Sequence, residues 1–439
     1  MSLSWTLAIE ALSWIELERL NEDAAIRKTV KQLRISDRAI VQAASKLVYE
    51  TIRRKNSIDY LINSSLDPDK IGNQTVGVRS FLRMFTYYAH YSEESLGTAY
   101  QLAQHAEGLL GKRDMGRIDE GMTLLPLASI PFDRLTDVQR LAYTHFHPVW
   151  YVDYLYNRFG VTEAEDLLRY VDTPSYLRVN TLKAEPDAIN TLMDMGVGLV
   201  KEPLLEDTYK VLDEDGITDS KLYRDGHFIM QDKASVAVGA IVNPKPGEVV
   251  LDVCAAPGVK TSHMAQLMEN QGRIISIDYN LRRLKSWEGL MGKLGVTIAK
   301  PIHGDASSPD VLTHIDADVV VIDPPCTGSG TFHKEPSGKW RLTPRSVDRM
   351  ASLQRRIIEN MSGYVRPGGV LVYSTCSVTL DENEGVVNWF LERNPDFEIV
   401  DAEPHIGSPG LDGLDKAQRM YPHVHDCNGF FIAKLVKSL

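Results

Sequence analysis

Two of the four cysteines follow segments that are predicted to be buried strands, and a thiol in that position could act as a nucleophile. Cys326 ends the run 319–326, in which four apolar residues lead into Asp-Pro-Pro-Cys. Cys376 follows the apolar segment 370–374. Because a thiolate is a strong nucleophile, either sulfur could form a covalent bond to an electron-poor carbon. The alternative is that each cysteine packs as a small apolar residue, and the spacing alone does not rank the two.

Acidic residues end three consecutive predicted strands, at Asp278, Asp305 and Asp323. In open α/β sheets, ligands bind outside the carboxyl ends of the strands. Asp278 follows the second strand, where a carboxylate can accept hydrogen bonds from both hydroxyls of a ribose. Asp305 follows the third strand and is placed for a polar contact to an adenine edge. Each acid alone could be an exposed loop residue, but the three together indicate a nucleoside ligand.

The segment 252–261, at the end of the first predicted strand, has the composition of a cofactor loop. Its small residues and single glycine let the backbone approach a ligand, and the helix that follows directs its amide dipoles at that ligand. The segment matches neither G-x-G-x-x-G nor the P-loop pattern, so a dinucleotide is not indicated. The candidate cofactor-binding residues of this loop are Cys254, Ala255, Ala256, Pro257, Gly258, Val259 and Lys260.

These residues require a sheet whose strands end at a common edge. Strands and helices alternate from residue 249 onward, which predicts a doubly wound parallel sheet with helices on both faces. The strands that precede the two cysteines should be neighbours, so both sulfurs would project over one edge. The predicted strands are 249–253, 273–278, 297–302, 319–323, 370–374, 397–400 and 429–436, and the predicted helices are 261–268, 281–294, 346–365 and 384–393.

At 439 residues the chain is long enough for two or three domains, and its sequence pattern changes twice. Residues 1–135 are predicted to be all-helical, with the aromatic segment 80–88 in the core. Residues 136–230 are predicted to hold linker helices and a small α+β subdomain, and residues 231–439 the parallel sheet. The predicted fold class is therefore α/β, with a small α+β domain and an all-α N-terminal domain before it.

Composition excludes several classes of protein. The net charge of −11 does not indicate a nucleic-acid binder, although local basic clusters such as Arg53-Arg54-Lys55 could still contact a polyanion. Four cysteines without paired spacing argue against a disulfide framework and against a zinc site, so no metal is predicted. The apolar runs are too short for a transmembrane helix and no signal peptide is recognised. We therefore expect a cytoplasmic protein without membrane contact, and a monomer is favoured.

Three motifs together resemble the RNA 5-methylcytosine methyltransferases of the Sun/Fmu/RsmB family. They are the loop 252–261, the segment 323–328 (Asp-Pro-Pro-Cys-Thr-Gly) and the segment 373–377 (Tyr-Ser-Thr-Cys-Ser). Residues 178–181, 418–423 and 429–431 also match, and the resemblance covers roughly residues 140–439. The helical N-terminus resembles the NusB-like domain of one branch. Val259 departs from the family, which usually has a glycine there, so ordinary backbone angles are expected at that position.

The resemblance implies a class I (Rossmann-like) methyltransferase domain, S-adenosylmethionine as cofactor and a cytosine in RNA as substrate. It implies that Cys376 attacks cytosine C6 and that Cys326 assists the release of the product. Asp323 would hold the cytosine edge, and Lys260 would contact the cofactor or the base. Asp278, Asp305 and Asp323 are expected to join the loop residues 254–260 in binding the cofactor.

Several alternatives stay open. Ribosomal RNA is the favoured substrate because the branch with a NusB-like domain methylates small-subunit ribosomal RNA, and transfer RNA is the first alternative. A DNA cytosine methyltransferase also carries a Pro-Cys nucleophile but needs no second cysteine after the next strand. An amino-group methyltransferase has an aromatic residue where Cys326 stands. A non-catalytic RNA-binding protein has no need of both thiols and three acids at strand ends.

Overall fold

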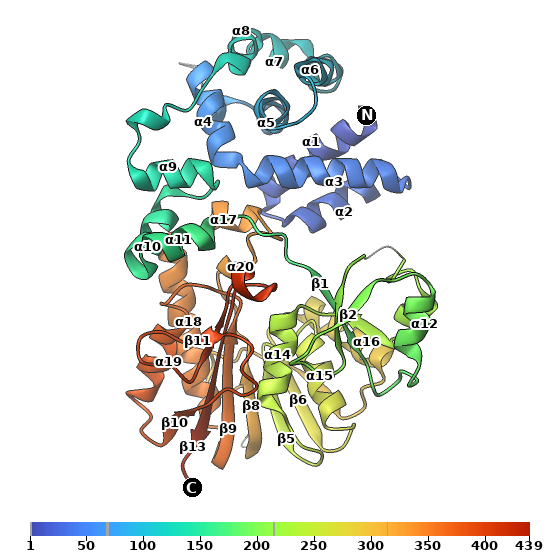
Figure 1. Cartoon of the computed structure of the whole chain (residues 1–439), viewed down its shortest axis with the longest axis vertical. Coiled ribbons are helices and arrows are strands. Elements are labelled where there is room, and N and C mark those ends of the chain that lie inside the picture. The colour runs from blue at the N-terminus through green and yellow to red at the C-terminus, as the bar shows by residue number, and fades with distance from the viewer. Residues whose placement is uncertain (1, 67–69, 214–215, 314) are drawn as a thin grey trace. The chain divides into compact units, whose positions relative to one another are not determined.

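The computed structural model describes residues 2–66, 70–213, 216–313 and 315–439. They divide into two compact units, which Figure 1 shows coloured along the chain. The first unit comprises Met1–Tyr170 with Lys334–Leu342, and the second comprises Val171–His333 with Thr343–Leu439. Within the described residues, no helix is both long and apolar enough to cross a membrane.

The first unit is helical and is built around one apolar core, as its sequence predicts. Phe81 and Phe85, on α5, are fully buried. The aromatic stripe of α5 therefore packs in the core and presents no stacking surface for bases. The helices of this unit are α1 (Ser2–Glu18), α2 (Glu22–Leu33), α3 (Arg38–Arg53), α4 (Lys55–Ser65), α5 (Val76–His90), α6 (Leu96–Leu110), α7 (Lys112–Gly116), α8 (Asp119–Leu124), α9 (Asp137–Thr144), α10 (Val149–Phe159), α11 (Val161–Leu168) and α17 (Ser337–Arg341), with the short 3₁₀ turns η1 (Ile71–Asn73), η2 (Leu125–Leu127) and η3 (Phe132–Arg134).

Residues 334–342, which include α17, pack with these helices although the chain reaches them only after strand β8 (Ala317–Ile322). The buried Glu22 carboxylate accepts hydrogen bonds from the backbone N–H of Ser337 at 2.6 Å and from its hydroxyl at 3.1 Å. Trp340 Nε1 donates to the Ile52 carbonyl at 2.5 Å. Burial raises the pKa of Glu22 because the carboxylate loses hydration there. The segment is thus held by specific polar contacts.

The second unit begins with a small antiparallel sheet in the order β2-β3-β1-β4. Arg178 on β1 is fully buried and donates to Gln231 Oε1 and Ser262 Oγ, each at 2.8 Å, and also to Gln266. Burial lowers the pKa of Arg178 to about 9. These bonds attach the small sheet to the helix that follows the cofactor loop. The elements are β1 (Ser175–Val179), α12 (Ala188–Asp194), β2 (Leu199–Lys201), β3 (Thr208–Val211), α13 (Lys221–Arg224) and β4 (Phe228–Met230).

The large sheet has the strand order β11-β12-β13-β9-β8-β5-β6-β7, with β10 paired to β13. Its elements are α14 (Lys233–Val242), β5 (Val249–Val253), α15 (Val259–Leu267), β6 (Arg273–Asp278), α16 (Leu281–Leu294), β7 (Ala299–His303), β8 (Ala317–Ile322), η4 (Ser329–Thr331), α18 (Pro344–Ser362), β9 (Val365–Thr375), α19 (Glu384–Leu391), β10 (Phe397–Val400), β11 (Ser408–Pro409), β12 (Gln418–Met420), α20 (Pro422–His425) and β13 (Phe430–Lys437).

The five strands from β5 to β9 are parallel, as predicted, but the last strands are not. β13 runs antiparallel to β9, and β10 and β12 run antiparallel to β13. A wholly parallel sheet was therefore the wrong expectation for the C-terminal part. A parallel strand needs a crossover, whereas an antiparallel strand can pair after a simple reversal of the chain. Between β10 and β13 the described chain has the short strands β11 and β12, and its only helix there is the four-residue α20.

Helices cover both faces of the large sheet, and the apolar sequence of β8 explains why this strand is buried on both sides. Val320 and Ile322 belong to one apolar cluster, with residues of α18 and α19. Val319 and Val321 belong to the other, with residues of α14 and α15. Because successive side chains of a strand point to opposite faces, an uninterrupted apolar run is the pattern of a strand covered on both sides. The strand order reverses at β5: β6 and β7 follow on one side of it, and β8 and β9 follow on the other. Sheets of this kind bind ligands at such a reversal, outside the carboxyl ends of the strands.

Candidate active site

The two candidate cysteines lie side by side at the carboxyl edge of the large sheet. β8 and β9 pair in parallel, with Ile322 opposite Tyr373, so the segments that follow them leave the sheet together. Cys326 Sγ is 3.1 Å from Cys376 Sγ, and both thiols are free and partly buried. The predicted neighbourhood of the two strands is confirmed, and the tertiary structure adds direct contact between the sulfurs.

The surroundings of Cys326 change the proton affinity of its thiol. The contact with Cys376 and burial together raise the pKa of Cys326 well above its ordinary value. The largest cause is the hydrogen bond with Cys376 Sγ 3.1 Å away, which the protonated Cys326 thiol can donate and a thiolate cannot, and burial adds to the rise because it removes water. Cys326 therefore keeps its proton at neutral pH.

Lys260 and Asp323 form an ion pair beside the cysteines. Lys260 Nζ, at the start of α15, donates to Asp323 Oδ2 at 2.7 Å, and the Ser374 hydroxyl donates to Asp323 Oδ1 at 3.2 Å. Burial acts against the charge of Lys260, but the Asp323 carboxylate outweighs it and raises the pKa of Lys260, with a further contribution from Cys376. A lysine ammonium, a carboxylate and a thiol therefore share one small volume at the ends of three elements.

The cofactor loop places Gly258 where only glycine fits. Its φ is +108°, and a Cβ there would lie 2.8 Å from Trp287 Cδ1 and from Met291 Cε. Val259 begins α15 and is not among the residues with positive φ, which confirms the backbone expected at that position. Burial and the nearby acids raise the pKa of the Cys254 thiol, so this cysteine stays neutral.

A cavity of about 290 Å³ lies at the ends of β6 and β7 and reaches the loop after β8. Asp278 and Asp305 both line it, as do the loop residue Cys254 and Pro325, which precedes Cys326. The rest of the lining is mostly small or apolar: Ile277, Tyr279, Gly304, Ala306, Ser307, Met350, Leu353 and Ile357. The structure thus brings two of the three predicted strand-end acids into one pocket and places the third, Asp323, with the cysteines.

The Asp278 carboxylate already organises the loop around it. Its Oδ2 accepts from the Ala256 N–H at 3.2 Å and lies 3.3 Å from Arg283 Nη1, while Oδ1 accepts from the Asn280 N–H at 2.9 Å. In Asp305, Oδ1 accepts from the Ser307 N–H at 2.9 Å and from its hydroxyl at 2.7 Å. Because a carboxylate has about four lone-pair sites, these bonds leave capacity for ligand hydroxyls.

The sequence interpretation gave no individual role to two buried acids of this region. Asp252 ends β5; its Oδ2 accepts from the Thr261 hydroxyl at 2.5 Å, and burial raises its pKa to about 7. Glu382 lies just before α19 and accepts bonds from both cysteine loops. Its signal in the sequence was the acidic run Asp-Glu-Asn-Glu at 381–384, which is also typical of the start of a helix.

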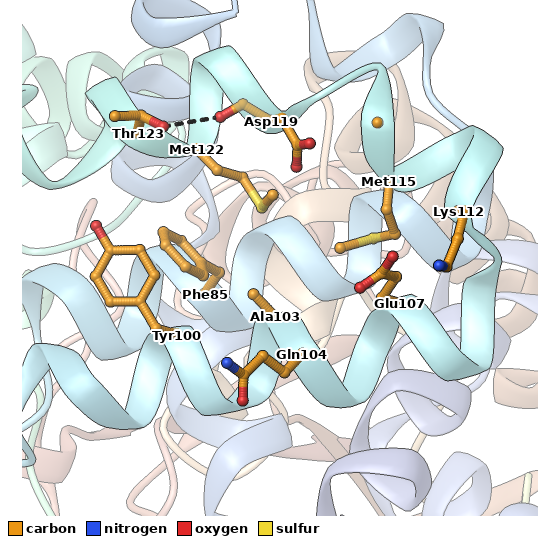
Figure 2. Close-up of a pocket in the computed structure, with 11 residues that line it drawn as sticks. Phe85, Tyr100, Ala103, Gln104, Glu107, Lys112, Met115, Asp119, Met122 and Thr123 are labelled. Carbon is orange, nitrogen blue, oxygen red and sulfur yellow. Dashed lines mark hydrogen bonds between the residues drawn. The ribbon is translucent and has the colours of Figure 1, made fainter.

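A larger cavity lies in the helical unit, and Figure 2 shows the side chains that line it. Its volume is about 490 Å³, and its lining joins α5, α6, α7 and α8. Phe85, Met115 and Met122 contribute apolar surface, whereas Glu107 and Lys112 lie together at one end of the view. Elsewhere, no group of three or more histidine, cysteine or acidic side chains in the described chain could hold a metal ion.

The chain is similar in sequence to known RNA methyltransferases. Residues 239–436 match the family model described as 16S rRNA methyltransferase RsmB/F. A probable ribosomal RNA small subunit methyltransferase B of Synechocystis is 30% identical, over 90% of this chain and 90% of that protein. The chain belongs to the RsmB/F methyltransferase family. The region that matches the family model contains the cofactor loop, both cysteines and Glu382.

Two further relatives show the range of this family. A tRNA (cytosine(72)-C(5))-methyltransferase of Pyrococcus horikoshii is 40% identical over 50% of this chain and 55% of its own length. The solved structure called "Crystal Structure of PH0851" is 30% identical with a TM-score of 0.87, over 100% of this chain and 99% of that one. The likeness to a solved structure thus extends over the helical N-terminal region as well as the Rossmann-like sheet.

Proposed function

We propose that this RsmB/F family member transfers a methyl group to C5 of a cytosine in RNA, with ribosomal RNA as the favoured substrate. One observation carries the proposal: two free thiols 3.1 Å apart stand beside the Lys260–Asp323 ion pair at the ligand-binding edge of the sheet. The names of the relatives, which include enzymes for ribosomal and for transfer RNA, support the same reaction class.

Cys376 is the proposed nucleophile. Cytosine C5 is a poor nucleophile, and addition of the Cys376 thiolate to C6 forms an S–C6 bond and moves the C5–C6 π electrons onto C5. Asp323 Oδ atoms accept hydrogen bonds and suit the amino group of the cytosine edge, while the Lys260 ammonium is a donor beside the same base. Both charged groups are paired in the structure, so their positions are set before a base arrives.

Cys326 is proposed to act after methylation. A base removes the C5 proton, the C5–C6 double bond re-forms, and the Cys376 sulfur leaves as a thiolate. The Cys326 thiol lies at hydrogen-bond distance from that sulfur and holds its proton, so it can stabilise the departing thiolate. This assignment agrees with the separate roles that the family resemblance implies.

S-adenosylmethionine is the proposed methyl donor, and the pocket at β6 and β7 fits it. Apolar walls suit a flat base, and the Asp278 and Asp305 carboxylates suit a ribose diol and the polar edge of an adenine. Residues 254–260 and the amino end of α15 would hold the rest of the molecule. When bound, the cofactor supplies a methyl group on a positively charged sulfur. Pro325 lines this pocket and precedes Cys326, so cofactor and cytosine sites would adjoin.

The remaining segments are proposed to select the RNA. Residues 1–135 would form a NusB-like domain that binds RNA or a protein partner, and residues 136–230 would contact RNA next to residues 231–439, which carry the reaction. Transfer RNA is the alternative substrate, and the protein is expected to work in the cytoplasm as a monomer.

Radiolabelled S-adenosylmethionine tests the proposal directly. Purified protein is incubated with ribosomal RNA, transfer RNA and DNA, and the modified nucleoside is identified after digestion. Label in 5-methylcytidine of RNA is expected. Label confined to DNA, or in an N-methylated nucleoside, would contradict the proposal, and bisulfite sequencing of cellular RNA with and without the gene would locate the target.

A further inference from the structure

Glu382 is a fully buried acid that joins the two cysteine loops. Its Oε2 accepts from the Thr327 N–H at 2.9 Å and from Gln354 Nε2 at 3.0 Å. Its Oε1 accepts from the hydroxyls of Thr327 at 2.5 Å, Ser377 at 2.8 Å and Thr379 at 2.9 Å. One carboxylate therefore takes five hydrogen bonds, which is more than its roughly four lone-pair sites, so its accepting capacity is fully used.

The donors to this carboxylate lie next to both cysteines in the sequence. Thr327 directly follows Cys326, and Ser377 directly follows Cys376, so Glu382 holds the residue after each cysteine. Gln354 Nε2, from α18, also donates to the Pro325 carbonyl at 3.0 Å, on the other side of Cys326. The two loops are 50 residues apart in sequence. The pairing of β8 with β9 ends at Ile322 and Tyr373, before either cysteine is reached, so it does not hold the two loops together.

A second set of contacts closes the loops further out. Ser329 Oγ is 2.9 Å from Ser377 Oγ, and the Gly330 N–H donates to the Cys376 carbonyl at 2.9 Å. A Cβ at Gly330 would lie 2.0 Å from the Gly429 carbonyl oxygen, so the backbone approach there requires glycine. These contacts also bring the loops together, and one of them holds the Cys376 backbone directly; Glu382 differs from them because it binds the residue after each of the two cysteines.

We infer that Glu382 is a positioning residue that sets the separation of Cys326 and Cys376. The inference deepens the proposed function and rests on it for its catalytic consequence: Cys326 can serve release only while it stays against the Cys376 sulfur. A side chain at position 382 that is too short to bind both loops lets the two sulfurs move apart. Displacement of reacting groups by about 1 Å can lower a reaction rate about 100-fold. Attack by Cys376 suffers less than release, so the covalent RNA adduct accumulates.

Two substitutions distinguish the effect of the length of the Glu382 side chain from the effect of its charge. Glu382→Asp keeps the carboxylate but shortens the side chain by one methylene, so it cannot reach both loops at once. Glu382→Gln keeps the length; its amide oxygen can accept from the Thr327 N–H, while its NH₂ can donate to the hydroxyls. Positioning therefore predicts that the aspartate variant is impaired more than the glutamine variant. Glu398→Gln, on the exposed part of β10, is the matched control.

The first measurement does not depend on the proposed function. Wild-type protein and variants are exposed to oxidised glutathione, which oxidises two adjacent thiols to a disulfide and is reduced to two glutathione thiols. Formation of the Cys326–Cys376 disulfide is followed by mass spectrometry. We expect it to be at least 10-fold slower in Glu382→Asp than in wild type, with Glu382→Gln between them. Equal rates in all three proteins would overturn the inference.

The second measurement follows the covalent adduct on denaturing gels, together with turnover. If Glu382 only stabilises the fold, Glu382→Asp lowers the fraction of active protein and leaves the ratio of covalent adduct to turnover unchanged. If Glu382 positions the two cysteines, Glu382→Asp raises that ratio. Slow disulfide formation without any adduct, even in Cys326→Ala, would support positioning and refute the proposed function. If Glu382→Asp fails to fold, Thr327→Val removes one hydroxyl donor and is put through both measurements with the same expected direction.

Discussion

The ionisation of Asp252 gives a quantitative prediction for stability against pH. Asp252 is buried at the end of β5, where its Oδ2 accepts from the Thr261 hydroxyl at 2.5 Å. Burial raises its pKa to about 7 from an ordinary 3.8; Thr261 and Lys260 act in the opposite direction, and the charges of Asp323 and Asp278 add to the rise. The folded protein therefore holds this proton far more tightly than the unfolded chain does.

The sign of the effect follows from this direction. Stability contributed by the bound proton is fully present below pH 3.8 and is lost as the pH rises to about 7. With about 1.36 kcal/mol for each pKa unit, ionisation of Asp252 in the folded protein costs about 4 kcal/mol once the pH is well above 7. Asp252→Asn removes this titration, so the stability of the variant relative to wild type should rise with pH.

Thermal and urea unfolding of wild type, Asp252→Asn and the exposed control Asp415→Asn between pH 5 and pH 8 measures the effect. The difference between Asp252→Asn and wild type should move by about 2–4 kcal/mol in favour of the variant across this range. The control should follow wild type at every pH. A difference that stays constant from pH 5 to pH 8 would refute the assignment of a buried, protonated Asp252.

Four further predictions concern the site and its supports. Cys376→Ala should abolish methyl transfer without changing the melting temperature, and retention of the wild-type rate would remove it as nucleophile. Cys326→Ala should accumulate a protein–RNA adduct that survives denaturing gels; unchanged turnover without adduct would exclude its role in release. Gly258→Ala, at a φ of +108°, should lower stability by about 1–3 kcal/mol and weaken S-adenosylmethionine binding in calorimetry. Glu384→Gln should lower the free energy of unfolding in urea by about 3–5 kcal/mol, because it leaves the charge of the buried Arg419 unpaired; the Arg419 guanidinium lies 2.5 Å from the Glu384 carboxylate. The double variant Glu384→Leu with Arg419→Met should recover much of this loss.

The order of strands and helices could be predicted from local patterns. Helix α16 has the predicted bounds, and β6 and β10 also coincide with their predicted ranges. Each of these patterns repeats within the element itself, at 3.6 residues for a helix or through a run of apolar residues for a buried strand. The direction of β13 could not be predicted in this way, because an apolar strand has the same pattern whether it pairs in parallel or antiparallel.

The amino-acid sequence by itself determined which residues stand at strand ends, since an apolar run that stops at Asp-Pro-Pro-Cys or Ser-Thr-Cys-Ser marks that end locally. Only the tertiary structure decided what these residues touch. The contact between Cys326 and Cys376 joins positions 50 residues apart, and it depends on pairing of β8 with β9. The five bonds to Glu382 likewise come from separate segments that meet only in the fold. The pKa values of the site residues also depend on the tertiary structure, because burial and neighbouring charges are properties of the folded site and of no single segment.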